Sequence, residues 1–131
     1  MHSGTGIHIL ADRSSHLVIE ATEAWSKAMH ARAYSTAASE LESTLAAVDS
    51  RTMDAVVYVE ACWRLVVSFI LLREWDRAEY WLEAAGRKER SVYMQKLCNA
   101  YWSSYMDWVK TADPELAKHP RFQTLVAMIP R

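Results

Sequence analysis

The stretch AVVYVEACWRLVVSFILL, residues 55–72, decides the fold of this chain. Its only strongly polar residues are Glu60, Arg64 and Ser68, which are spaced four apart. On a helix this spacing places them in one narrow stripe, with nearly every other position apolar. On a strand, charged and apolar side chains would instead share one face. The pattern therefore predicts a helix over about residues 53–73 that is covered on most sides, with an ion pair between Glu60 and Arg64.

The same stretch has the length of a membrane span, which is the competing interpretation. Glu60 and Arg64 lie near its middle, where a charge is expensive in lipid. A buried central helix is therefore the better interpretation, and we expect no membrane association. Residues 1–13 hold an apolar patch that is too short for the core of a signal peptide, and we expect a flexible lead-in there.

Further helices follow from apolar residues at helical spacing and from the residues that interrupt them. Gly86 is expected to end the fourth helix in a left-handed conformation, and Pro120 and Pro130 bracket the last helix. The expected elements are helices over about residues 14–31, 34–48, 53–73, 75–85 and 89–110, a short turn over 115–118, and a helix that begins at Pro120. The sequence thus predicts one all-α domain over residues 14–131, with six to seven helices.

The composition supports one globular domain and excludes several functional classes. The 131 residues are 51% hydrophobic and 24% charged, and they include only 3 Gly and 3 Pro, which argues against a sandwich or barrel. The formal net charge of −1 lacks the basic surplus of a nucleic-acid-binding protein. Cys62 and Cys98 have no CxxC spacing and no neighbouring histidine. We therefore expect buried, reduced thiols in a cytoplasmic protein rather than a disulfide or a zinc site.

A short pattern occurs twice along the chain. An aromatic residue is followed by a small residue three positions later and by an aliphatic residue four positions after that: Tyr34, Ala37 and Leu41, then Trp75, Ala78 and Leu82. The small residue lets a neighbouring helix approach closely, so we expect Ala37 and Ala78 to be equivalent points of close contact. The two sets are offset by 41 residues, from position 34 to position 75.

With Leu65, Phe69 and Ala85, this pattern resembles the tetratricopeptide repeat (TPR) family. Residues 65–85 look like one full repeat and residues 34–41 like the second half of another. The closing run over residues 113–126, with HPRFQ at 119–123, is similar to the segment that often caps bacterial arrays of this kind. The match is degenerate, because Val66 and Arg90 replace the family's small residue and proline, and the offset exceeds the family's period of about 34 residues. The resemblance implies antiparallel helix pairs, stacked as a short right-handed solenoid or a compact bundle.

The sequence offers no motif that carries chemistry. None of the five histidines forms HExxH, and no glutamate stands three residues before a histidine, as di-iron bundles require. A Gly-rich phosphate loop and a Gly-x-Ser-x-Gly motif are also missing from the sequence. We therefore expect a protein that is not an enzyme, with no catalytic residue, no metal site and no cofactor.

The TPR resemblance also implies where a partner binds, because the first helix of each pair in such arrays faces a concave channel. Carried onto this chain, the channel residues come from three helices: Thr22, Glu23, Ser26, Met29 and His30; Glu60, Trp63, Arg64 and Val67; and Asn99, Ser103 and Met106. We expect Glu60, Trp63 and Arg64 to be partly exposed together and to form the centre of the site. Tryptophan and arginine are the residues that most often carry binding energy.

Two functions of different classes follow from this interpretation. The first is a protein–protein interaction module, such as an adaptor, chaperone, scaffold or inhibitor, that binds another protein or a peptide, with a homodimer as an additional assembly. The alternative is a small-ligand sensor whose aromatic residues surround an internal pocket. An open groove would favour the interaction module, whereas a pocket sealed among Trp63, Trp81 and Trp102 would favour the sensor.

Overall fold

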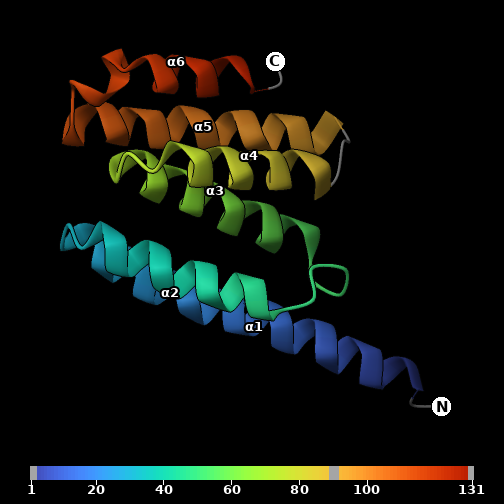
Figure 1. Cartoon of the computed structure of the whole chain (residues 1–131). Helices are drawn as coiled ribbons and strands as arrows, with labels where there is room; N and C mark the ends of the chain where they lie inside the picture. The colour runs from blue at the N-terminus through green and yellow to red at the C-terminus, as the bar shows by residue number, and fades with distance from the viewer. Residues whose placement is uncertain (1–2, 89–91, 130–131) are drawn as a thin grey trace.

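The computed structural model describes residues 3–88 and 92–129, and every regular element in this part of the chain is helical (Figure 1). The elements are α1 (Ser3–His30), α2 (Tyr34–Ala47), α3 (Ala55–Leu71), α4 (Trp75–Lys88), α5 (Val92–Ala112), the short 3-10 turn η1 (Leu116–Lys118) and α6 (Pro120–Ala127). The predicted all-α fold class is confirmed for the described residues. The predicted start of the fifth helix at residue 89 and the closing Pro130 lie outside them.

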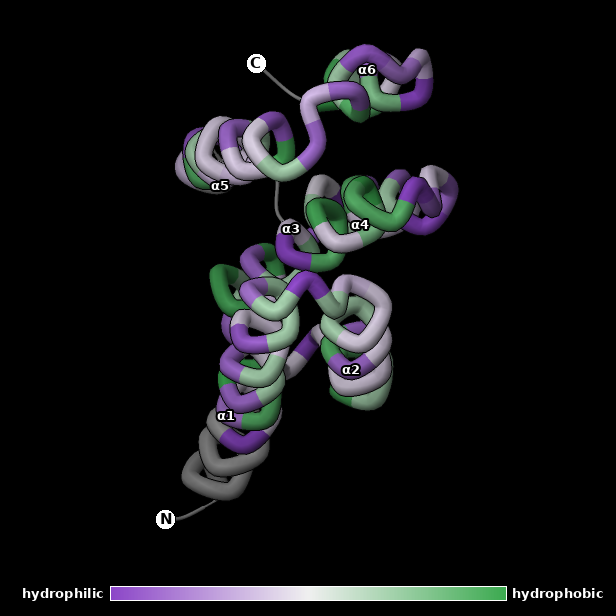
Figure 2. Tube along the Cα trace, turned by 90° about the vertical axis from the view of Figure 1, so that its left-hand side faces the viewer, coloured by the Kyte–Doolittle hydropathy of each residue, from purple (hydrophilic) through white to green (hydrophobic). Residues whose placement is uncertain are grey.

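The helices are arranged in three tiers, formed by α1 with α2, by α3 with α4, and by α5 with η1 and α6 (Figures 1 and 2). α1 packs most extensively on α2, and α3 on α4. α3 also contacts α1, α2 and α5, so it occupies the central place that its apolar sequence predicts. Figure 2 looks along the helices and shows α1, α3 and α5 on one side of the stack, with α3 set back, and α2, α4 and α6 on the other.

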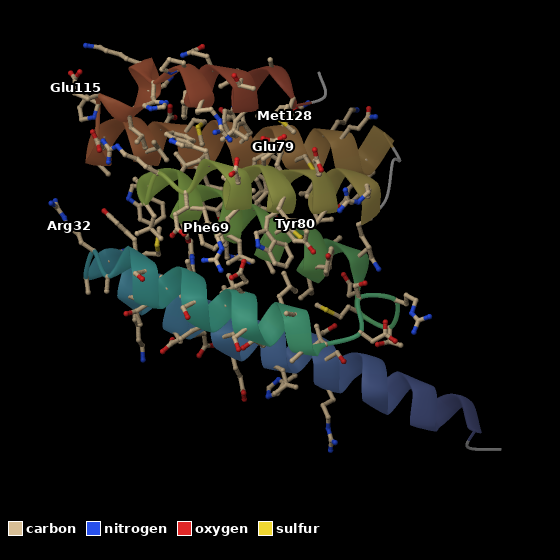
Figure 3. The ribbon with its side chains drawn as sticks, in the orientation of Figure 1. Arg32, Phe69, Glu79, Tyr80, Glu115 and Met128 are labelled. Atoms are coloured by element: carbon tan, nitrogen blue, oxygen red, sulfur yellow. The ribbon has the colours of Figure 1, made fainter. Side chains whose placement is uncertain are left out.

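The core is built around α3, whose ends are fixed by local interactions. The Asp54 side chain accepts hydrogen bonds from the backbone N–H groups of Val56 and Val57, at 2.9 and 3.2 Å, and so caps the first turn. From residue 61 to residue 71 every side chain except Arg64 is buried. Phe69 lies in the layer of side chains between the first and second tiers (Figure 3). None of the helices within residues 3–88 and 92–129 combines the length and the apolar character that a membrane span requires.

In each of the first two tiers, the turn between the two helices contains an arginine in the left-handed region of the backbone. Arg32 has a φ of 60° and Arg73 a φ of 59°. In both turns the residue after the arginine donates its N–H to the carbonyl five residues earlier, Ala33 to Ala28 at 2.8 Å and Glu74 to Phe69 at 2.9 Å. Positions 32 and 73 are 41 residues apart, which is also the offset of the repeated aromatic, small and aliphatic residues. The internal repeat thus extends to the backbone of the turn.

The two small residues of the repeat lie where the sequence predicts. Ala37 and Ala78 are both 0% exposed, one on each second helix of the first two tiers. Leu41 and Leu82 are also buried. The aromatic positions differ, because Trp75 is buried whereas Tyr34 is half-buried. A larger side chain at either alanine position has no space to occupy without moving a neighbouring helix.

Two predicted helix ends are wrong. α1 begins at Ser3, so residues 3–13, which we predicted as a flexible lead-in, continue the helix. A helix extends readily from an existing turn, and the two glycines in this segment weaken it without ending it. Gly86 does not end α4, which runs to Lys88, and no described glycine has a positive φ. A glycine inside a helix is tolerated when the residues after it still continue the turn.

Candidate functional site

The predicted ion pair between Glu60 and Arg64 is present on α3. Arg64 Nη2 lies 3.4 Å from Glu60 Oε2, and the two side chains are 20% and 29% exposed, respectively. The other carboxylate oxygen, Glu60 Oε1, accepts a hydrogen bond from the Tyr101 hydroxyl on α5. The pair is therefore held between two helices and still reaches solvent, as the sequence predicts for these two residues.

Aromatic rings from α1 and α5 flank this pair. The Arg64 guanidinium carbon lies 5.9 Å from the Trp25 ring centroid, which is cation–π distance. Trp25 meets Tyr105 and Trp108 edge-on, with ring centroids 6.4 and 6.1 Å apart. Tyr101 stacks on Tyr105 at 6.2 Å. We call this set the aromatic face, and it consists of Trp25, Glu60, Arg64, Tyr101, Tyr105 and Trp108.

The stripe of polar residues on α3 is open at one end and closed at the other. Ser68 is 0% exposed and is the one buried polar side chain in the described part of the chain. Its hydroxyl accepts a hydrogen bond of 2.7 Å from Trp25 Nε1 and donates one of 2.8 Å to the Arg64 carbonyl. Trp25 therefore covers the stripe beyond Arg64, and the exposed polar surface of α3 ends there.

The tyrosines of the aromatic face remain neutral at physiological pH. Burial, and next the hydrogen bond to Glu60, raise the pKa of Tyr101. Burial likewise raises the pKa of Tyr105. Both rings thus offer a hydroxyl that can donate or accept a hydrogen bond, beside one carboxylate and one guanidinium. This arrangement can bind polar and apolar groups of a partner, but it contains no activated nucleophile.

Trp63 is the main correction to the predicted site. It is 1% exposed and packs on Trp102 of α5, with ring centroids 5.8 Å apart. Trp102 in turn lies 5.9 Å from Phe122 of α6. One residue along a helix is a rotation of about 100°, so Trp63 points away from the Glu60–Arg64 stripe and into the layer that α5 and α6 cover. Val67, also 1% exposed, is core as well, so both residues leave the predicted partner-binding set.

The other predicted residues spread along the same side of the stack. His30 is exposed, and its ring lies 6.3 Å from that of Trp108, at the edge of the aromatic face. His30 Nδ1 is 2.8 Å from the carbonyl oxygen of Ser26, which is half-buried. The remaining members lie on α1 and α5 with different exposure: Glu23 and Ser103 are exposed, Thr22 and Asn99 are half-buried, and Met29 and Met106 are buried. The two methionines are therefore also corrections.

Sequence reasoning placed Asn99, Ser103 and Met106 of α5 at this site but missed the aromatic residues of the same helix. Tyr101, Tyr105 and Trp108 were not among the expected partner-binding residues, yet all three are only half-buried. Their spacing of four and then three residues places them on one face of a helix. A run of three aromatic residues that can each keep a polar atom in water was the available signal.

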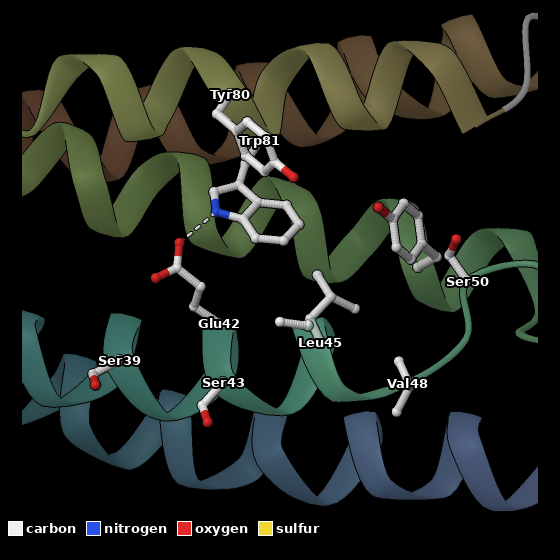
Figure 4. Close-up of a pocket in the computed structure, with 10 residues that line it drawn as sticks. Ser39, Glu42, Ser43, Leu45, Val48, Ser50, Tyr80 and Trp81 are labelled. Carbon is white, nitrogen blue, oxygen red and sulfur yellow. Dashed lines mark hydrogen bonds between the residues drawn. The ribbon is translucent and has the colours of Figure 1, made fainter.

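A groove with a volume of about 610 Å³ lies on the opposite side of the molecule, between α2 and α4 (Figure 4). We call it the α2–α4 groove, and its lining consists of Ser39, Glu42, Ser43, Leu45, Ala46, Val48, Ser50, Tyr58, Tyr80 and Trp81. Trp81 Nε1 donates a 2.7 Å hydrogen bond to Glu42 Oε2, and Arg77 Nη2 lies 3.3 Å from Glu42 Oε1. Trp81 thus faces α2, whereas Trp63 and Trp102 pack together elsewhere, and the three rings do not enclose one pocket.

The two cysteines are free and buried, as predicted. Burial raises the pKa of Cys62 to about 12, and burial also raises the pKa of Cys98. Trp63 Nε1 has no conventional hydrogen-bond acceptor among the described residues and is close enough to the Cys98 thiol to affect its pKa.

No protein-family model, curated protein or solved structure matches the chain.

Proposed function

We propose that this protein is a TPR-like interaction module that binds a partner protein or peptide on the aromatic face. The observation that carries the proposal is the half-buried Glu60–Arg64 pair between Trp25 and the α5 tyrosines. Burying a charge is costly unless it is paired, so a pair kept at the border of the core needs either water or a partner.

The residue types of the aromatic face support binding rather than stability alone. Tyrosine, tryptophan and arginine are enriched among the residues that dominate binding energies. Tyr101, Tyr105 and Trp108 are each partly in contact with solvent, and their rings are held by one another and by Trp25. A face that is already ordered loses little conformational entropy when a partner binds.

The TPR-like assignment is supported by the repeat in both sequence and backbone. Ala37 and Ala78 are equally buried, and Arg32 and Arg73 adopt the same left-handed conformation 41 residues apart. α1, α3 and α5 lie on one side with α3 set back (Figure 2), which is the side that the family resemblance assigns to binding. We further propose a reducing compartment such as the cytoplasm, which the free thiols of Cys62 and Cys98 support.

Affinity capture from cells that express the chain tests the proposed function. Arg64→Gln combined with Tyr105→Ala should lose a captured protein, while Lys118→Gln, at an exposed position of η1 outside both surfaces, should retain it. In calorimetry, the captured partner, once purified, should bind the double variant at least about tenfold more weakly than it binds the parent. Helical content and melting temperature of each variant must first match the parent. Equal binding by the parent and a folded double variant would refute a site on the aromatic face.

A further inference from the structure

The α2–α4 groove is independent of the aromatic face. It opens on the side of the stack that carries the second helix of each tier (Figures 2 and 4). Its walls come from α2 and α4, and Tyr58 of α3 contributes to its lining. Glu42 spans the gap between the walls through its contacts with Trp81 and Arg77. A volume of about 610 Å³ is within the range of pockets that bind ligands.

We propose that the α2–α4 groove is a second binding site, and that it takes a peptide segment of a partner protein in which an apolar side chain stands next to a carboxylate. The aromatic face plays no part in this site. Three features of the groove favour such a segment: its apolar floor, an exposed aromatic residue at its rim, and the charge at one of its ends.

The floor offers a pocket for an apolar anchor. Leu45, Val48 and Trp81 line it, and the hydrogen bond to Glu42 fixes the orientation of the Trp81 ring. Tyr80 stands at the rim, 57% exposed, with its ring edge-on to Trp81 at 5.0 Å. Exposed large aromatic residues beside a concave surface are typical of binding sites, and an edge-to-face pair leaves room for a further ring or aliphatic group.

The two ends of the groove differ in charge. At one end the Glu42 carboxylate is already matched by Arg77 and by the Trp81 N–H. Near the other end, Lys88 Nζ donates a hydrogen bond to the Ser50 carbonyl and lies 5.4 Å from the Tyr58 ring centroid. Neither of these two partners of Lys88 carries a charge, and the nearby Asp49, whose pKa Arg51 lowers most and Lys88 least, is already paired with Arg51. The ammonium group therefore makes this end attractive for an anion, which charge complementarity identifies as a carboxylate beside the apolar anchor.

Hydroxyl groups near this end strengthen the same preference. Ser50 and Tyr58 line this end of the groove, whereas Ser43 lies beside Glu42 at the other end (Figure 4). Burial, as the largest cause, raises the pKa of Tyr58 to about 12, so its phenol stays protonated at physiological pH, and its hydroxyl also interacts with the Cys62 thiol. A ligand rich in acceptors fits these donors better than a basic one does.

Two synthetic hexapeptides, capped at both ends, test the site by amide NMR titration. One has the sequence EELFEE and the other KKLFKK, so that they share the apolar centre and differ in charge. The acidic peptide should shift the resonances of Ser43, Tyr80 and Lys88, and added salt should weaken its binding. Lys88→Gln and Tyr80→Ala should each weaken binding about tenfold. Tyr93→Ala, which removes a similarly exposed tyrosine that lies on α5, should leave the affinity for the acidic peptide unchanged.

Several results would overturn the proposal. Equal shifts with the basic peptide would remove the charge argument, and shifts confined to Tyr101 and Tyr105 would assign the peptide to the aromatic face instead. No shift at millimolar peptide would show that the groove does not bind this class. If the chain alone is a dimer in light scattering and Tyr80→Ala makes it monomeric, the occupant is a second copy. None of these outcomes depends on Arg64, so the proposed function is tested separately.

Discussion

Trp25 Nε1 donates a 2.7 Å hydrogen bond to Ser68 Oγ and thereby joins the first tier to the last turn of α3. Both side chains are buried, at 5% and 0% exposure. This bond satisfies the one buried polar side chain among the described residues, and it places the Trp25 ring beside Arg64. The same contact thus stabilises the core and shapes the edge of the aromatic face.

Ser68→Ala should lower the free energy of unfolding by about 1–3 kcal/mol, because it leaves the buried Trp25 N–H without an acceptor. Urea unfolding followed by circular dichroism measures the change. Thr111→Ala is a matched control, since it removes an exposed hydroxyl that bonds only within its own helix. If the two variants lose equal stability, the bond between Trp25 and Ser68 contributes nothing specific.

Ala78→Leu and Ala37→Leu should each destabilise the protein by about 1–3 kcal/mol, because both positions are fully buried between helices. Thermal unfolding is a suitable measurement. Ala100→Leu, at an exposed position in the middle of α5, should leave the melting temperature nearly unchanged. An unchanged melting temperature for Ala78→Leu would remove the main support for the repeat.

The free energy of unfolding should fall as the pH rises above 9. The pKa of the Cys62 thiol has its ordinary value of 9.0 in the unfolded chain, whereas burial raises it to about 12 in the folded one. Between these values the folded state binds more protons, so alkali favours unfolding. Tyr58, raised from 10.0 to about 12, adds to the effect at higher pH.

Urea unfolding at pH 7.5 and at pH 10, compared between the parent and Cys62→Ala, measures this dependence. The variant should lose less stability between the two pH values, even though it is less stable at both. In native buffer, both thiols should react slowly with an aromatic disulfide reagent, since a protonated, buried thiol is a poor nucleophile. Fast labelling of Cys62 would contradict its placement on α3.

His119 should act as the N-cap of α6. Its Nδ1 accepts the backbone N–H of Arg121 at 3.1 Å, and its ring stacks on Trp75 at 4.8 Å. His119→Ala should therefore lower the free energy of unfolding by about 0.5–2 kcal/mol, whereas His119→Asn should retain most of the cap. Chemical denaturation distinguishes the two variants. Equal losses for both would show that ring stacking, rather than capping, is what His119 contributes.

The sequence predicted α3 and its ion pair because both depend on spacing within one helix. Glu60 and Arg64 are one turn apart, and no packing partner is needed to place them together. The burial of Ala37 and Ala78 was predictable for the same reason, since a repeated pattern indicates a repeated contact.

The errors concern contacts between helices that are distant in sequence. Trp63 was expected to be partly exposed beside Glu60 and Arg64, but its exposure depends on where α5 and α6 pack, and spacing along α3 contains no information about that. The exposed part of the polar stripe on α3 ends at Arg64, because Trp25 from α1 covers Ser68. The α2–α4 groove was not predicted, since it depends on the distance between two tiers rather than on a motif.

The left-handed conformation of Arg73 lowers the free energy of unfolding of the protein compared with glycine at the same position. A residue with a side chain costs roughly 1–2 kcal/mol in this region compared with glycine. Arg73 Nη2, however, forms a 2.7 Å ion pair with Asp113, beyond the end of α5. Arg73→Gly would relieve the backbone and at the same time remove one ion pair between the second and third tiers. The turn at Arg73 therefore keeps a strained backbone together with an ion pair between two tiers. Arg32, in the equivalent turn, is the better position at which a substitution by glycine can make the protein more stable.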